Sequence, residues 1–106
     1  MKVLMVCLGN ICRSPMADAL LRKKVKENKL NIFVDSAGTA GYHIGSKPDP
    51  RMMKTGLKFG VDTSELRARQ FIVKDFDEFD FIYVMDEENY SNVISLARDF
   101  KDESKV

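Results

Sequence analysis

Residues 7–15 read Cys-Leu-Gly-Asn-Ile-Cys-Arg-Ser-Pro and lie between a predicted strand and a predicted helix. The strand is the apolar run Lys-Val-Leu-Met-Val at 2–6, which is typical of a buried strand. The helix is predicted to begin with Ser14 as its N-cap and Pro15 at its first position. Backbone N–H groups of a loop at a helix N-terminus bind anions. We therefore expect a phosphate-binding loop made of Leu8, Gly9, Asn10, Ile11, Cys12 and Arg13.

The residue types in this loop suit phosphoryl transfer. Such a reaction needs an in-line nucleophile and fixed positive charge around the equatorial phosphate oxygens. Cys7 can supply the nucleophile, because helix N–H groups and a guanidinium favour a thiolate. Arg13 can bind two oxygens with its planar fork, which a lysine cannot do. Ser14 can hydrogen-bond the sulfur, so the predicted catalytic residues are Cys7, Arg13 and Ser14.

Composition limits the other functions that are open to the chain. Its 106 residues are 44% hydrophobic and 31% charged, which predicts a single domain with a modest core. The net charge of +1 gives no reason to expect nucleic acid or a membrane surface as a partner. We see no targeting segment, so we expect a cytoplasmic protein. The two cysteines match no disulfide framework or metal-site spacing, and we expect neither a metal nor a cofactor.

Strand-like and helix-like runs alternate, which predicts a parallel α/β sheet. Strands are predicted at 2–6, 31–35 and 80–85, with a long loop at 36–48. Helices are predicted at 16–28, from Asp49-Pro50 to a stop at Gly60, as a turn near Phe76, and after a cap at Asp86. The first helix is expected to bury Ala17, Leu20, Leu21 and Val25. A phenylalanine cluster is expected in the core: Phe76, Phe79 and Phe81.

Five motifs in order carry a resemblance to a known family. They are VCLGNICRSP at 6–15, DSAGT at 35–39, PDPR at 48–51, RARQ at 67–70 and MD at 85–86. Together they resemble the low-molecular-weight protein tyrosine phosphatases over the whole chain. The resemblance implies a flavodoxin-like three-layer sandwich with its site at the carboxyl ends of the strands. It also implies hydrolysis of phosphotyrosine or aryl phosphate monoesters through a phosphocysteine.

The resemblance assigns further roles to single residues. It implies that Ser14 helps Cys7 to act as nucleophile and leaving group, and that Asn10 holds the strained loop backbone. Tyr42 and His43 would wall the substrate cleft, although a solvated loop tip is the alternative. Cys12 would form a reversible disulfide with Cys7 under peroxide, or else be a small packed side chain. The residues that support the loop would be Asn10, Ser36, Asp49 and Arg51.

Two departures from the family pattern bear on activity. Leu66 stands where many relatives have a histidine that hydrogen-bonds the loop asparagine. The Asp-Pro-aromatic segment with the family's general acid is absent, since the one Asp-Pro is Asp49-Pro50. The sequence stops at Val106, where a fourth strand and last helix would follow. We therefore expect residues 1–106 to be a single phosphatase-like domain that is incomplete at its C-terminus.

Three functions remain open at this point. The first is a tyrosine phosphatase acting on a phosphotyrosine protein or a small aryl phosphate. The second is a phosphate or phosphotyrosine binding module with little turnover, which the missing acid keeps open. The third is an arsenate reductase of the same fold, which would need distal cysteines that the sequence lacks. Asp86 is expected to cap a helix rather than to act as a catalyst, and the oligomeric state is left open.

Overall fold

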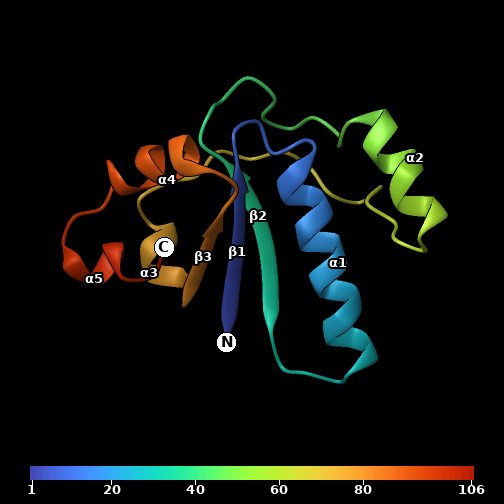
Figure 1. The fold of residues 1–106 in the computed structure, drawn as a ribbon, viewed down its shortest axis with the longest axis horizontal. Helices are drawn as coiled ribbons and strands as arrows, with labels where there is room; N and C mark the ends of the chain where they lie inside the picture. The colour runs from blue at the N-terminus through green and yellow to red at the C-terminus, as the bar shows by residue number, and fades with distance from the viewer.

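A computed structural model describes all 106 residues. Three parallel strands form one sheet: β1 (Lys2–Cys7), β2 (Phe33–Gly38) and β3 (Phe81–Val84), in the order β2-β1-β3. The register aligns Cys7 with Gly38 and Val6 with Val84, so the carboxyl ends of the strands meet at one edge (Figure 1). The predicted parallel α/β sheet is confirmed.

Helices cover both sides of this sheet and complete the expected three-layer sandwich. On one side, α1 (Arg13–Glu27) runs alongside β1 and β2, and α2 (Pro50–Lys58) lies beyond it (Figure 1). On the other side lie α3 (Asp75–Glu78), α4 (Glu87–Ile94) and α5 (Phe100–Glu103). None of these helices combines the length and the apolar character needed to cross a membrane.

The main core lies between the sheet and α3, α4 and the segment before α3. Alternate residues of each strand face this core, as the period of two for strand side chains requires. Its members are less than one-tenth exposed: Leu4, Val6, Ala37, Phe71, Phe76, Phe79, Ile82 and Val93. Because the core packs on all three strands, it holds their carboxyl ends in place. The candidate site lies at these ends.

The predicted start of the first helix is wrong by two positions. The helix begins at Arg13, and Cys12 occupies the N-cap position without a side-chain capping bond. Ser14 therefore lies inside the first turn and Pro15 at the third position rather than the first. The Ser14 hydroxyl does not cap the helix because it contacts the Cys7 sulfur and accepts a hydrogen bond from Asn10.

Two packing predictions also need correction. On α1 the buried residues are Ser14, Pro15, Asp18 and Ala19, whereas the predicted Leu20 is 44% exposed. Phe81 is 43% exposed and stacks on Tyr83, because α1 packs on β1 and β2 but does not reach β3. Strand β2 runs three residues beyond its predicted end, to Gly38, since it pairs with β1 up to Cys7.

The predicted helix start at Asp49-Pro50 and the predicted cap at Asp86 are confirmed. Asp49 caps α2 by accepting hydrogen bonds from the backbone N–H groups of Arg51 and Met52. Asp86 caps α4 by accepting from the Asn89 N–H at 2.7 Å.

Candidate phosphate-binding and catalytic site

Cys7 ends β1, and its thiol lies under the loop that leads into α1. The residue is 3% exposed. The backbone N–H of Asn10 donates to the Cys7 Sγ at 3.2 Å, and the Ser14 Oγ lies 3.0 Å from the same sulfur. A sulfur that accepts from the Asn10 N–H and has the Ser14 hydroxyl in hydrogen-bond range is suited to carry negative charge, because hydrogen bonds to the charged form stabilise it.

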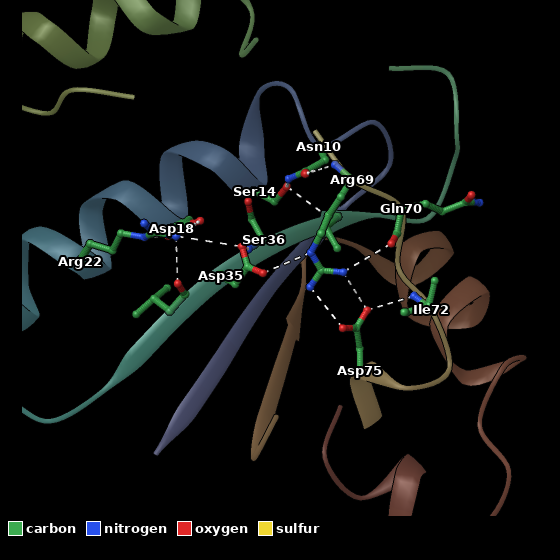
Figure 2. Close-up of polar contacts among 12 residues, drawn as sticks. Asn10, Ser14, Asp18, Arg22, Asp35, Ser36, Arg69, Gln70, Ile72 and Asp75 are labelled. Atoms are coloured by element: carbon green, nitrogen blue, oxygen red, sulfur yellow. Dashed lines mark hydrogen bonds and ion pairs between the residues drawn. The ribbon is translucent and has the colours of Figure 1, made fainter. Parts of the chain in front are cut away.

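Asn10 holds the loop together from within. Its φ of 57° lies in the left-handed region, which asparagine tolerates better than most residues. The residue is 1% exposed, and both ends of its side-chain amide are hydrogen-bonded. Nδ2 donates to Ser14 Oγ at 2.7 Å, and Oδ1 accepts from the Arg69 N–H at 2.9 Å (Figure 2). The asparagine is thus hydrogen-bonded on both sides although Leu66 provides no imidazole.

A cavity of about 260 Å³ opens above the sulfur. The strand end and the loop form one wall, and Tyr42 and His43 form the other. The His43 ring packs closely on Gly9, where an added Cβ would lie 3.0 Å from the imidazole Cδ2. The eight lining residues include most of the predicted phosphate-binding set and both predicted cleft residues: Cys7, Leu8, Gly9, Ile11, Cys12, Arg13, Tyr42 and His43.

Arg13 lies at the rim of this cavity and pairs with Asp86. Its Nη1 donates to Asp86 Oδ2 at 3.1 Å, and both side chains are about half exposed. The Asn89 N–H, together with the Arg13 guanidinium, holds the pKa of the Asp86 carboxyl below its usual range. Asp86 therefore remains a carboxylate that caps α4 and orients Arg13, which fits the predicted capping role.

The residues expected to support the loop do so unequally. The Asp49 backbone N–H donates to the Ile11 carbonyl at 2.6 Å, which ties the start of α2 to the loop. Its carboxyl pairs with Arg51, whose side chain is 94% exposed and makes no bond to the loop; this pairing lowers the pKa of Asp49. Ser36 likewise makes no hydrogen bond to the loop. Its backbone N–H donates to Asp35 Oδ1 at 2.8 Å on the same strand, and its expected role in loop support stays a prediction.

Support for the loop comes in part from residues that the sequence reasoning missed. The Arg69 backbone holds Asn10, and the Arg69 side chain binds Asp35 and Asp75. The sequence places Arg69 in the RARQ motif at 67–70 but indicates no role for it. A buried asparagine in a loop needs donors from elsewhere in the chain, but no sequence pattern identifies which segment provides them.

The two cysteines differ in their surroundings. Both thiols are free, and Cys7 is buried while Cys12 is exposed. Cys12 borders the active cavity and also a second hollow, beside α2. No three His, Cys, Asp or Glu side chains are grouped so that they could hold a metal ion.

Comparisons with known proteins agree with this geometry. Residues 2–106 match the family model described as low molecular weight phosphotyrosine protein phosphatase. A putative low molecular weight protein-tyrosine-phosphatase of Synechocystis is 47% identical over 97 residues, covering 90% of this chain and 61% of the relative. The human low molecular weight phosphotyrosine protein phosphatase is 49% identical over 89 residues, covering 82% and 56%.

Solved structures show the same similarity. The crystal structure of a protein tyrosine phosphatase from Entamoeba histolytica superposes with a TM-score of 0.93 and 39% identity, covering 99% of this chain and 67% of that one. The structure of a Drosophila arginine phosphatase superposes with a TM-score of 0.81 and 38% identity, covering 91% and 59%. The chain thus spans about three fifths of the length of the curated relatives that it matches. By its sequence, its sheet and the loop around Cys7, this chain belongs to the low-molecular-weight phosphotyrosine protein phosphatase family.

Proposed function

We propose that this chain hydrolyses phosphate monoesters, with phosphotyrosine or an aryl phosphate as substrate, through a phosphocysteine at Cys7. The observation that carries the proposal is the position of the Cys7 sulfur. The sulfur lies at the base of a cavity, accepts a hydrogen bond from the Asn10 N–H and contacts the Ser14 hydroxyl. Arg13 lies at the rim of the same cavity. These are the nucleophile, the hydrogen-bond donors and the fixed positive charge that phosphoryl transfer requires.

The proposed reaction has two steps, the formation and the hydrolysis of the phosphocysteine. In the first, the Cys7 thiolate attacks phosphorus, an S–P bond forms, and the P–O bond to the phenolate breaks. Arg13 uses only Nη1 on Asp86, so its other N–H donors remain for the phosphate oxygens. In the second step water attacks phosphorus, so that a P–O bond forms, the S–P bond breaks, and the proton of the water passes to solvent as inorganic phosphate is released. Ser14 then stabilises the departing thiolate of Cys7 through the 3.0 Å contact.

Protonation of the leaving oxygen is the weak point of this site. None of the eight residues that line the cavity carries a carboxyl group. Asp86, the carboxylate that pairs with Arg13, already accepts bonds from Arg13 and from Asn89. The site therefore favours substrates whose leaving group needs no proton, and this feature supports the binding module as the second candidate function.

The aromatic wall of the cavity supports a flat substrate. Tyr42 is 77% exposed and contacts the His43 ring edge-on with centroids 6.2 Å apart, so its face is accessible for stacking on a phosphotyrosine ring. One relative is named an arginine phosphatase, so phosphoarginine is the comparison substrate for a specificity assay. A preference for aryl phosphate would support the aromatic wall as the recognition element.

The exposed Cys12 supports a redox role for the loop. Both cysteines lie in the loop region and both are free thiols, so a disulfide between Cys7 and Cys12 would protect the nucleophile from irreversible oxidation. Peroxide treatment followed by reduction is expected to restore activity in the wild type. A Cys12→Ser variant is expected to lose that recovery.

The first test of the proposed function removes the nucleophile. Cys7→Ser is expected to abolish hydrolysis of p-nitrophenyl phosphate, because a serine hydroxyl at this position lacks an activating base. Binding of inorganic phosphate, measured by calorimetry, is expected to persist, since the anion contacts come from backbone N–H groups and Arg13. Turnover that survives in Cys7→Ser would rule out the proposed nucleophile.

Arg13→Lys tests the second half of the site. It is expected to be nearly as damaging as Arg13→Ala, because the fork of N–H donors rather than the charge alone binds two phosphate oxygens. A lysine variant with kcat/KM within about tenfold of wild type, a difference of only ~1.4 kcal/mol, would contradict this assignment.

A further inference from the structure

We propose that Arg69 is a positioning residue for the nucleophile: its side chain fixes the backbone N–H that holds Asn10 against Ser14 and Cys7. The inference rests on the proposed function in one respect, that Cys7 is the reacting group. Figure 2 shows the arrangement, with Arg69 between Asn10 above it and two carboxylates, Asp35 and Asp75, on its other sides.

A continuous chain of hydrogen bonds joins Arg69 to the sulfur. The Arg69 N–H donates to Asn10 Oδ1 at 2.9 Å, and Asn10 Nδ2 donates to Ser14 Oγ at 2.7 Å. Ser14 Oγ then lies 3.0 Å from the Cys7 Sγ. Asn10 also donates its own backbone N–H to the sulfur. A shift of the Arg69 backbone therefore changes both hydrogen-bond partners of the sulfur, the Asn10 N–H and the Ser14 hydroxyl, through one intermediate residue.

The backbone of Arg69 lies outside every helix and strand. The segment at 61–69 is irregular, and the neighbouring Gln70 makes only an isolated parallel bridge with Gly38. That bridge uses the Arg69 carbonyl, which accepts from the Gly38 N–H at 2.8 Å, and leaves the Arg69 N–H for Asn10. Backbone hydrogen bonds tie this segment to Gly38 and, through Ala68, to Gly45 and Ser46. The side chain adds contacts with Asp35 and Asp75 that these backbone bonds do not provide.

The side chain is anchored at three of its nitrogens. Nε donates to Asp35 Oδ2 at 3.1 Å on β2, while Nη1 and Nη2 donate to the two Asp75 oxygens at 3.0 and 3.2 Å on α3. The Asp75 side chain is only 3% exposed and also accepts from the Ile72 N–H. The guanidinium thus joins β2, α3 and the irregular segment. A lysine has one nitrogen and cannot reproduce the forked contact with Asp75 together with the separate contact with Asp35.

The experiment measures the reactivity of Cys7 toward iodoacetate, with Cys7 and Cys12 distinguished by peptide mass mapping. The rate near neutral pH is divided by the rate in alkaline buffer, so that a change in the accessibility of the sulfur cancels. Arg69→Lys is the main variant. Arg98→Lys is the matched control, because Arg98 also bridges two aspartates, Asp77 and Asp102, but makes no contact with the loop.

Arg69→Lys is expected to lower this ratio about fivefold, the effect of weakening one hydrogen bond to the reactive sulfur. Arg98→Lys is expected to leave it unchanged while lowering the melting temperature comparably. In an Asn10→Gly background, which keeps the left-handed backbone but removes the side chain, Arg69→Lys is expected to have no further effect. Asp35→Asn removes one anchor and provides a milder variant, expected to act in the same direction if Arg69→Lys does not fold.

Two results would overturn the inference. One is an unchanged ratio in folded Arg69→Lys, or in Asp35→Asn where the first variant does not fold. The other is an effect that persists undiminished in the Asn10→Gly background. Alkylation needs no substrate, so the outcome is separate from the proposed function. A wild-type chain without turnover would refute the proposed function and leave the effect of Arg69 on Cys7 measurable.

Discussion

Gly38 ends β2 directly beside the phosphate-binding loop, and at this residue the absence of a side chain is required. A Cβ there would lie 2.7 Å from the Leu8 carbonyl oxygen and 3.0 Å from the Asn10 nitrogen. These are backbone atoms of the loop and cannot move aside as a flexible side chain would. β2 thus approaches the loop so closely that a residue with a side chain does not fit at this position.

Gly38→Ala is therefore expected to displace the loop and to lower both phosphate affinity and kcat/KM. Overpacking of this kind costs about 1–3 kcal/mol, and a loss of this size in binding free energy corresponds to roughly 5- to 150-fold in affinity. Calorimetry with inorganic phosphate and kinetics with p-nitrophenyl phosphate measure the two effects.

Gly41→Ala is the control for this prediction. Its added Cβ would lie 3.3 Å from the Gln70 side-chain oxygen, which can move. A Gly38→Ala variant that binds phosphate as tightly as Gly41→Ala would show that the loop does not depend on this contact.

At the scale of elements, Arg98 connects α3 and α5 across the side of the sheet opposite α1. Its guanidinium donates to Asp77 of α3 at 2.6 Å and to Asp102 of α5 at 2.8 Å. The side-chain bond from Arg98 lowers the pKa of Asp102 to about 2. The ion pairs of Arg98 thus link α3, which also buries Phe76 in the core, to α5.

This lowered pKa predicts an acid-dependent stability. A carboxyl whose folded-state pKa is depressed contributes stability above its unfolded pKa of 3.8, and the contribution is lost as the pH falls from there toward about 2. Asp102→Asn is expected to be less stable than wild type at neutral pH, and the difference is expected to shrink in acid. Urea unfolding at several pH values measures it.

Glu65→Gln is the control for Asp102→Asn, because Glu65 is exposed and forms no ion pair or side-chain hydrogen bond. A stability difference between Asp102→Asn and wild type that stays constant from neutral to acid pH would contradict the role of the Arg98 pair.

Elements with a clear period were predictable from the sequence, and contacts between distant segments were not. The runs at 2–6 and 80–85 and the Asp49 and Asp86 caps carry local signals, and the structure has elements there. The cap at Ser14 was mispredicted because a local signal was overridden when Cys7 and Asn10 engaged the hydroxyl. Helix α5, with only four residues, shows no period and was not predicted.

For the site, too, the residues within one short segment were predictable and the contacts between distant segments were not. The spacing of Cys7 and Arg13 identified the loop, because both residues belong to one short segment between a strand and a helix. The contact of Arg69 with Asn10 spans 59 positions, and that with Asp35 spans 34. Nothing in the local sequence indicates such pairings. The exposure of Phe81 was missed for a related reason, since it depends on where α1 packs rather than on β3 itself.

At the scale of the whole molecule, the site has the groups proposed to bind phosphate but no carboxyl group in its lining. The proposed nucleophile, the proposed anion-binding loop and the contacts that support it lie within the described fold, while the cavity lining has no carboxyl group to protonate a leaving group. General acid catalysis typically contributes about 10² to 10⁴-fold. The chain is therefore expected to hydrolyse p-nitrophenyl phosphate much faster than phenyl phosphate, because the nitrophenolate leaves without a proton.

The most direct test of the central claim is to trap the phosphorylated enzyme. Rapid acid quench after mixing with p-nitrophenyl phosphate, followed by peptide mass mapping, is expected to place one phosphoryl group on the peptide that contains Cys7, together with a burst of nitrophenolate. The same peptide from Cys7→Ser is expected to carry none. If phosphate binds but neither a burst nor a phosphorylated Cys7 peptide forms in the wild type, the chain is a binding module and not the enzyme proposed here.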